Sequence, residues 1–402
     1  MPEPEFRPTR READPPSTLT AVIAVPVRNE AERIGPCLDA FAGQDGLGTG
    51  GLGVVLFLNN CTDDTARVVA ARAPDLPFRL RVIERDCAGA TAGWARREAM
   101  EAAAGWLEEE GAAGGIILTT DADCLAPADW VARNLAALAA GVEAVAGRIA
   151  LDPVDAARLP ASLHARGRLE GAYEALLVEL EACIDPLPHD PWPRHWTTSG
   201  ATLAVRLAAY RQVGGMPPLA VGEDRAFVSS LLSSDVRVRH DPGVLMVTSG
   251  RLDGRAPGGA ADTMRLRCKV PESPCDPRLE SLPLALVRFA WRRRLRRLHA
   301  AGRLSRTRLW APWLGIRAAQ AREVAELASL GAVLAAVEQV SPRLGYRPLR
   351  PSELPAQIRR ARAVLAALRV AGRVFRWGRG LSAPEPAAGT AGPRPVERPG
   401  NA

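Results

Sequence analysis

The segment LTAVIAVPVRNE, residues 19–30, joins a short apolar run to an abrupt polar end. Two later segments repeat this form: GVVLFLNNCTDD at residues 53–64 and GGIILTTDADC at residues 114–124. Continuous runs rich in Val, Ile and Leu are typical of parallel strands that are buried on both faces. Stretches of helical character separate the runs. Strands that alternate with helices predict an open α/β sheet with right-handed crossovers.

The expected elements change in kind near residue 275. Before that point, helical stretches alternate with short strands. Helices are expected at Glu30–Ala42, Asp64–Arg72, Gly93–Glu110, Ala128–Ala140 and Ala161–Ala182, and a further helix begins within 221–227. Further strands are expected at 78–84 (an edge strand), 201–205, 236–240 and 244–248. After that point strand signals stop, and helices are expected at Leu284–Ala300, Ala318–Val340 and Pro355–Trp377. The sequence therefore predicts four segments: a disordered lead-in at 1–18, an α/β domain at 19–270, a helical arginine-rich extension at 271–380 and a disordered tail at 381–402.

Composition excludes several classes of protein. The 402 residues are 47% hydrophobic and 24% charged, which is the balance of a globular chain rather than a disordered or fibrous one. No apolar run reaches the ~18 uncharged residues that a membrane-spanning helix needs, and the N-terminus lacks the apolar core of a secretion signal. The seven cysteines are odd in number and form no CxxC pair, which favours reduced thiols. We therefore expect a cytoplasmic protein.

Unusual polar residues follow three of the expected strands. The first strand runs into PVRNE (26–30), the second into NNCTDD (59–64) and a later one into DADC (121–124). In open α/β sheets, ligands bind beyond the carboxyl ends of the strands. These residues are therefore expected at one edge of the sheet.

Asp121 and Asp123 are two residues apart, which places both carboxylates on one face of an extended backbone. Hard divalent ions such as Mg²⁺ or Mn²⁺ take oxygen ligands and fill their remaining positions with phosphates and water. The pair therefore suits a metal ion that holds phosphate groups. The alternative is that one of the two aspartates only caps the helix that begins near residues 127–129.

Three more features are candidates for function. Glu223 and Asp224 open a helix whose dipole keeps a carboxylate ionised, so Asp224 could accept a proton from an attacking hydroxyl; alone, the motif is more often a helix cap. Arg251 and Arg255 lie on a glycine-rich loop, where guanidinium groups could neutralise a diphosphate, and the alternative is a solvated loop in an arginine-rich chain. His240 could be a third metal ligand, although a lone histidine is more often structural.

Taken together, the motifs resemble those of family 2 glycosyltransferases of the GT-A fold. VIAVPVRNEAERIGPCLDAF, LNNCTDDTARVV, TTDADC, TSGATLAVRLAAYRQVGGM and VGEDRAF occur in the order typical of that family, over about residues 19–260. The resemblance implies a mostly parallel open sheet flanked by helices. The α-helical C-terminal extension, expected from its own pattern, matches no part of the family. It also implies an enzyme that moves a sugar from a nucleotide-diphosphate donor to an acceptor hydroxyl, with Mg²⁺ or Mn²⁺ as cofactor.

The resemblance also implies roles for individual residues. Those that would hold the nucleotide are Pro26, Val27, Asn29, Glu30, Asn59, Asp63 and Arg96. Asp121, Ala122 and Asp123 would bind the donor's diphosphate, the two aspartates through the metal, while Ser199 and Gly200 would line the donor sugar and acceptor side. Asp224 matches the general base of inverting members, Glu223 would position hydroxyls, and Arg251 or Arg255 would stabilise the departing diphosphate.

The sequence departs from the family pattern in places, and other functions stay open. Asn59 and Asn60 stand where many members have an aspartate, so recognition of the base is expected to differ. The QxxRW motif and membrane helices of the processive synthases are absent, which favours a single addition. If His240 acts as the distant histidine of glucosylglycerate-type synthases, the enzyme would retain configuration. Two further alternatives are a nucleotidyltransferase on a similar sheet and an inactive basic membrane-surface or scaffold protein.

The arginines of the extension have three interpretations. Only one of the 52 basic residues, Lys269, is a lysine, and the net charge is +7. Two stretches, 288–297 and 359–377, set arginines among aromatic and aliphatic residues. Such helices can lie peripherally on an anionic inner membrane surface, bind an acidic partner, or pack against the α/β domain. No recognised module accompanies the charge, so nucleic acid binding is not expected.

Overall fold

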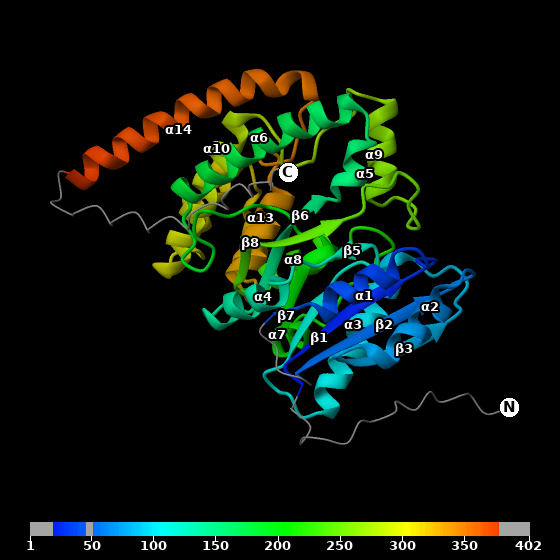
Figure 1. Ribbon diagram of the computed structural model, residues 1–402. Coiled ribbons are helices and arrows are strands. Elements are labelled where there is room, and N and C mark those ends of the chain that lie inside the picture. The colour runs from blue at the N-terminus through cyan, green and yellow to red at the C-terminus, as the bar shows by residue number, and fades with distance from the viewer. Residues whose placement is uncertain (1–18, 46–50, 378–402) are drawn as a thin grey trace.

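The computed structural model describes residues 19–45 and 51–377 (Figure 1). The segments expected to be disordered, 1–18 and 381–402, lie outside the described residues. A curled sheet forms the centre of the described part, with helices on both of its faces. The C-terminal helices gather at the end of the molecule away from strands β2 and β3 (Figure 1).

The sheet has two halves that differ in strand direction. Its strands in the described chain are β1 (Ala21–Val27), β2 (Leu52–Asn59), β3 (Arg79–Arg85), β4 (Ile116–Thr119), β5 (Cys124–Leu125), β6 (Ala144–Leu151), β7 (Leu203–Arg206) and β8 (Val238–Thr248). They lie in the order β3-β2-β1-β4-β7-β6-β8-β5. The first four pair in parallel, β7 runs antiparallel to both of its neighbours, and β8 is parallel to β6 but antiparallel to β5. The expected open α/β sheet is confirmed, and its second half is mixed.

Helices connect the strands and then form the whole C-terminal part. Those of the α/β part are α1 (Ile34–Ala42), α2 (Thr65–Arg72), α3 (Ala92–Glu109), α4 (Trp130–Ala139), α5 (Pro153–Ala157), α6 (Ala161–Ile184), α7 (Leu207–Gln212), α8 (Glu223–Ser233) and α9 (Ala260–Lys269). They are followed by α10 (Leu282–Ala300), α11 (Ala311–Leu314), α12 (Ala318–Ala325), α13 (Leu330–Val340) and α14 (Leu354–Trp377). The expected helical C-terminal region is thus confirmed.

Buried apolar side chains cover both faces of β1. Ile23 and Val25 pack with α1 and α4 in one core, while Val22 and Ala24 pack with α3, α7 and α8 in the other. Burial on both faces explains the unbroken apolar run at residues 21–25, because neither face of the strand meets water.

The two strands expected at 236–240 and 244–248 are one strand, β8. The turn signal between them, Asp241-Pro242-Gly243, lies inside a bulge: Ala146 of β6 faces His240, whereas Arg148 faces Leu245. Gly147 of β6 is therefore the single residue opposite four residues of β8, 241–244. A Cβ on Gly147 would lie 2.4 Å from the Thr202 hydroxyl, so only glycine lets the bulge pack this closely.

Other elements also differ from expectation. β6 and α9 were not expected, because the apolar part of β6 is only Ala144–Ala146 before a glycine and an arginine intervene. The single helix expected at Ala318–Val340 is two helices, α12 and α13. Ser329 begins the second of these by accepting the N–H of Ala332 at 3.1 Å, a side-chain cap that interrupts the apolar periodicity.

The C-terminal helices share a core with α6 and enclose a buried ion pair. Tyr173 of α6 packs with Phe289 of α10 and Leu354 of α14. Beside them, the buried guanidinium of Arg288 donates to both carboxylate oxygens of Glu280, at 2.7 and 2.8 Å. No helix within residues 19–45 and 51–377 is both long and apolar enough to cross a membrane.

Replacing Glu280 with Gln should lower the free energy of unfolding by about 3 kcal/mol, since it leaves the Arg288 guanidinium buried without its bidentate partner. Urea denaturation of both proteins measures the difference. Glu323→Gln, on the exposed surface of α12, should change stability by less than about 0.5 kcal/mol. Equal effects of the two substitutions would show that the ion pair does not contribute as described.

Candidate functional site

The carboxyl ends of β1, β2 and β4 lie side by side, because β1 pairs in parallel with both neighbours. The segments that follow these strands therefore meet at one edge of the sheet, as their sequence positions predict. The first of the residues expected to bind nucleotide, metal and phosphate lie in these segments, at this edge of the sheet.

Asn29 and Asp63 join two of these segments. Asn29 adopts a positive φ of 53°, and its Oδ1 accepts the N–H of Thr62 at 2.7 Å. Asp63 accepts the N–H of Ala31 at 3.1 Å and the N–H and hydroxyl of Thr65 at 3.0 and 2.5 Å. Partial burial alone would raise the pKa of Asp63, but these hydrogen bonds lower it, so the carboxylate stays ionised while it holds the loops together.

Asn59, Pro26 and Val27 lie at the ends of their strands. Val27 is buried and Pro26 is half-buried. The Asn59 side chain is buried, and its Oδ1 has no hydrogen-bond partner among the described residues. An unpaired buried oxygen costs roughly 1–3 kcal/mol, so this position suits an N–H donor from a ligand.

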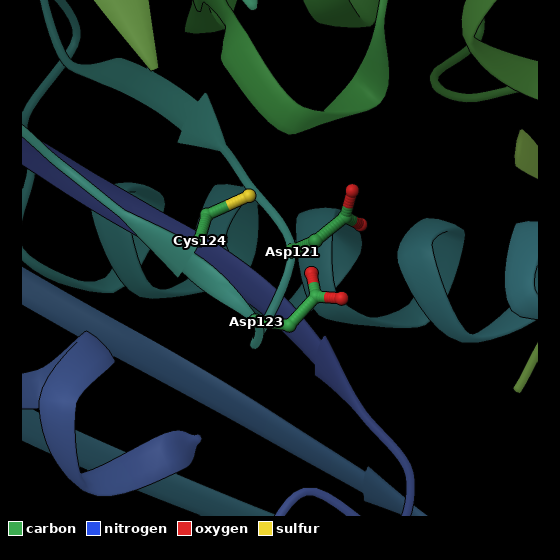
Figure 2. A group of neighbouring side chains, drawn as sticks. All are labelled: Asp121, Asp123 and Cys124. Atoms are coloured by element: carbon green, nitrogen blue, oxygen red, sulfur yellow. The ribbon is translucent and has the colours of Figure 1, made fainter. Parts of the chain in front are cut away.

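Asp121 and Asp123 form a compact acidic group with Cys124. Figure 2 shows the two carboxylates turned to the same side of the loop that follows β4. One ligand atom from each of the three residues lies within 4.8 Å of the others. Burial, together with both aspartate charges, raises the pKa of the Cys124 thiol to about 12, so the thiol stays neutral. The oxygen atoms of the two carboxylates are thus the donors that suit a hard cation.

Asp123 is linked to the segment after β1 through Arg251. The Arg251 guanidinium lies 3.1 Å from the Asp123 carboxylate and donates to both carboxylate oxygens of Glu30, one of them at 2.7 Å. Burial and the Asp121 charge raise the pKa of Asp123 to about 7, against the opposing effect of Arg251. A cation bound between the two carboxylates would favour the ionised form of Asp123 and so lower this pKa.

Arg96 of α3 links the acidic pair to the start of α8. Its buried guanidinium donates to Asp121 at 2.5 Å, to Glu223 at 3.1 Å, to the Thr119 hydroxyl at 3.0 Å and to the Gly200 carbonyl at 2.9 Å. Burial alone would lower the pKa of Arg96, but the charges of Asp121 and Glu223 raise it, so this cation is permanent. Both carboxylates keep a fixed position as a result.

Asp224, next to Glu223, is oriented by the 199–202 segment. Its Oδ2 accepts the N–H of Gly200 at 3.0 Å. Ser199 accepts the N–H of Ala201 at 3.3 Å and turns the chain there. A Cβ on Gly200 would lie 2.6 Å from the Arg96 Cζ, so glycine is required for the guanidinium to approach. The chain thereby brings Glu223, Asp224, Ser199 and Gly200 into one cluster with Arg96.

The remaining predicted residues divide into two groups. Ala122 is buried between the aspartates, and Arg255 donates to the Asn29 carbonyl at 3.1 Å, which ties the 249–259 loop to the sheet edge. His240 lies elsewhere, with its Nδ1 3.0 Å from Asp190. Its partner in β6, Ala146, is five residues from Leu151, the partner of Thr248, which in turn pairs with Cys124; this is a separation on the order of 16 Å. The structure does not bring His240 to the acidic pair.

Some residues of the site gave no signal in the sequence. Gly93 of α3 is one, since a Cβ there would lie 2.0 Å from the Leu219 carbonyl oxygen and would push away the loop that leads to Glu223.

Another feature is a cavity of about 270 Å³ beside Asp224, here named the Asp224 pocket. It is lined by Glu174, Trp196, Thr197, Thr198, Ser199, Asp224, Arg225, Asp276, Arg278 and Leu279. These residues come from distant parts of the sequence, which is why no local motif reveals the pocket.

Comparison with known proteins gives one family and several similar folds. The model of glycosyl transferase family 2 matches residues 22–180, and no curated protein matches the chain. The mannosyltransferase PcManGT from Pyrobaculum calidifontis, solved with GDP-Man and Mn²⁺, is 23% identical over 83% of this chain and 90% of that one, with a TM-score of 0.41. S. aureus TarS 1-349, solved with UDP-GlcNAc, is 16% identical over 90% and 92% of the two chains, with a TM-score of 0.43.

The chain spans only about a third of a longer S. aureus TarS structure: the match covers 36% of that protein and 58% of this one, at a TM-score of 0.38. The family match covers the strands and helices from β1 to α6, including Arg96 and the acidic pair. Residues 22–180 of this chain are thus similar to glycosyl transferase family 2.

Proposed function

We propose that the chain is a metal-dependent glycosyltransferase that moves one sugar from a nucleoside-diphosphate donor to an acceptor hydroxyl with inversion. The observation that carries the proposal is the Arg96 guanidinium, which is hydrogen-bonded to both Asp121 and Glu223. A carboxylate pair suited to a phosphate-bound cation and a carboxylate suited to proton transfer, Asp224, thus belong to one cluster. Sugar transfer from a diphosphate requires both groups near the same bond.

Asp121 and Asp123 would hold Mg²⁺ or Mn²⁺ through their carboxylate oxygens. When bound, such an ion supplies positive charge that stabilises the diphosphate as it leaves. Arg251 adds a guanidinium at the same edge of the sheet, 3.1 Å from Asp123. Asn59 and the Pro26–Glu30 segment would contact the base and ribose, and Ser199 the donor sugar.

Asp224 would act as the general base. Its Oδ2 is oriented by the Gly200 N–H, and the residue lies on the wall of the Asp224 pocket, where an acceptor can enter. As the acceptor oxygen bonds to the anomeric carbon, Asp224 takes the hydroxyl proton. The bond from that carbon to the diphosphate oxygen breaks, and its electron pair leaves with the diphosphate. The products are a glycoside, a nucleoside diphosphate and a proton that Asp224 releases to solvent.

The donor site is tested by thermal unfolding with UDP, GDP, dTDP, CDP and ADP, each with and without Mn²⁺. One nucleotide should raise the stability of the protein in a Mn²⁺-dependent way, by about 2.7 kcal/mol at a hundredfold excess over Kd. Asp123→Asn should abolish this shift, whereas Asp129→Asn, half-buried before α4 and paired with Arg133, should preserve it. No shift with any nucleotide would contradict the proposed function.

The role of Asp224 is tested by Asp224→Asn with the donor that the first experiment identifies. Turnover should fall by a factor of about 10²–10⁴, since the acceptor proton loses its base, while Mn²⁺-dependent nucleotide binding stays intact. Ser230→Ala on the same helix serves as the control. Turnover within a few-fold of normal would remove Asp224 from this role, and NMR of the product anomeric centre separates inversion from the retaining alternative.

We also propose that the extension contacts an anionic membrane surface. The supporting observation is a groove of about 590 Å³ whose lining includes Arg294, Arg297 and Arg303 together with the apolar Trp291 and Leu298. All three arginines are exposed. Cations at the edge of an apolar groove suit an anionic headgroup with its acyl chains.

Membrane contact predicts co-flotation with phosphatidylglycerol vesicles and not with phosphatidylcholine vesicles. The double variant Arg297→Glu/Arg303→Glu should bind at least about tenfold more weakly, because each basic residue contributes about 1 kcal/mol near such a surface. Arg317→Glu/Arg322→Glu, an equal charge change at exposed positions of the α12 region, is the matched control. Equal weakening by both double variants would show that net charge, and not the groove, is responsible.

A further inference from the structure

We propose that the extension completes the acceptor site, and that the acceptor group it admits is an uncharged, hydroxyl-rich unit such as a single sugar ring. The inference rests on the proposed function and adds to it the chemical class of the second substrate. It is drawn from the Asp224 pocket, whose wall includes Asp276, Arg278 and Leu279 of the extension.

The pocket lies where an acceptor must be. Asp224 contributes to its wall. Gly200 donates its N–H to Asp224, and its carbonyl accepts a hydrogen bond from Arg96. A hydroxyl group inside the pocket would therefore be next to the proposed base and close to the donor cluster. The 270 Å³ volume is just below the usual range for small-molecule pockets, roughly 300–1,000 Å³, and so matches one ring rather than an extended chain.

Both guanidinium groups of the pocket already have partners in the described chain, one in an ion pair and one in a hydrogen bond. Arg225 forms an ion pair with Asp276 at 3.1 Å. Arg278 donates to the Trp196 carbonyl at 2.7 Å, and its charge acts on Glu174. Two guanidinium groups thus face three carboxylates, those of Glu174, Asp224 and Asp276.

This charge balance disfavours an anionic acceptor. Burial raises the pKa of Glu174, but even with Glu174 protonated the two remaining carboxylates match the two guanidinium groups. The lining residues carry no net positive charge in either state, so a phosphate or carboxylate on the acceptor would meet at least as many carboxylates as guanidinium groups.

Hydroxyl recognition accounts for the rest of the lining. The Thr197 and Thr198 hydroxyls make no hydrogen bond to other residues of the described chain, and each can both donate and accept. The Trp196 indole N–H donates to Glu181 at 2.8 Å, which fixes the ring at the pocket wall. Carboxylates, hydroxyls and one oriented aromatic ring are groups that bind sugar hydroxyls and the apolar face of a ring.

The acceptor class is tested with the full chain, Mn²⁺ and the donor chosen by the nucleotide experiment, by measuring nucleoside diphosphate release. The probes are methyl glucoside, methyl mannoside and methyl galactoside, against glucose 6-phosphate, glycerol 3-phosphate and 3-phosphoglycerate. At least one uncharged glycoside should give a kcat/KM at least tenfold above every phosphorylated probe. Transfer to phosphorylated probes alone, or to no glycoside, would overturn the proposal, while an absence of nucleotide binding would overturn the proposed function first.

The contribution of the extension is tested with Arg278→Gln and Asp276→Asn. Each should raise the KM for the accepted glycoside at least tenfold and leave the Mn²⁺-dependent nucleotide shift unchanged, which also shows that the variant is folded. Arg322→Gln, an exposed arginine on α12, is the control and should change neither quantity. If Arg278→Gln does not fold, Asp276→Asn decides the matter; unchanged KM values in the folded variants would exclude the extension from the acceptor site.

Discussion

Burial of the Arg96 guanidinium is the constraint on which the rest of the site depends. A permanent cation can be taken out of water only where its donors are matched, and here Asp121, Glu223, the Thr119 hydroxyl and the Gly200 carbonyl provide that match. These acceptors come from three segments that lie between residues 119 and 223 of the sequence. Forming one set of hydrogen bonds therefore fixes β4, α8 and the 199–202 segment relative to one another, and with them the acidic pair and the proposed base.

The sequence predicts the parts of this arrangement that depend on local pattern. Apolar runs such as 19–25 identify strands buried on both faces, and the polar residues after them indicate the edge where Asp121 and Asp123 lie. Contacts between distant residues carry no such signal, and so neither the Glu30–Arg251 ion pair nor the Asp224 pocket could be read from motifs. For a related reason the sequence predicts two strands where the structure has one, β8. The turn residues inside β8 form a bulge opposite Gly147, and that bulge depends on pairing with β6.

Some arginines of the extension form ion pairs inside the protein. Arg288 is paired with Glu280, Arg292 with Glu181 and Glu338, and Arg296 with Asp185. Glu181 and Asp185 lie at or next to the end of α6, so these pairs join the extension to the α/β part. Other arginines of the extension, such as Arg297 and Arg303, are exposed and present their charge outward. The paired arginines contribute to the net charge but not to the surface available to an anionic partner.

The contact between α13 and α8 limits how the chain can be divided. The Asp235 carboxylate accepts the first N–H groups of α13, from Leu330 at 3.0 Å and Gly331 at 2.7 Å. A Cβ at Gly331 would lie 1.8 Å from the Leu232 carbonyl oxygen, so no other residue fits there without separating the two helices. For protein engineering, this makes the extension an integral part of the folding unit. A fragment cut between α9 and α10 would lose the support of the helix that begins with Glu223 and Asp224, and fusion partners belong beyond α14.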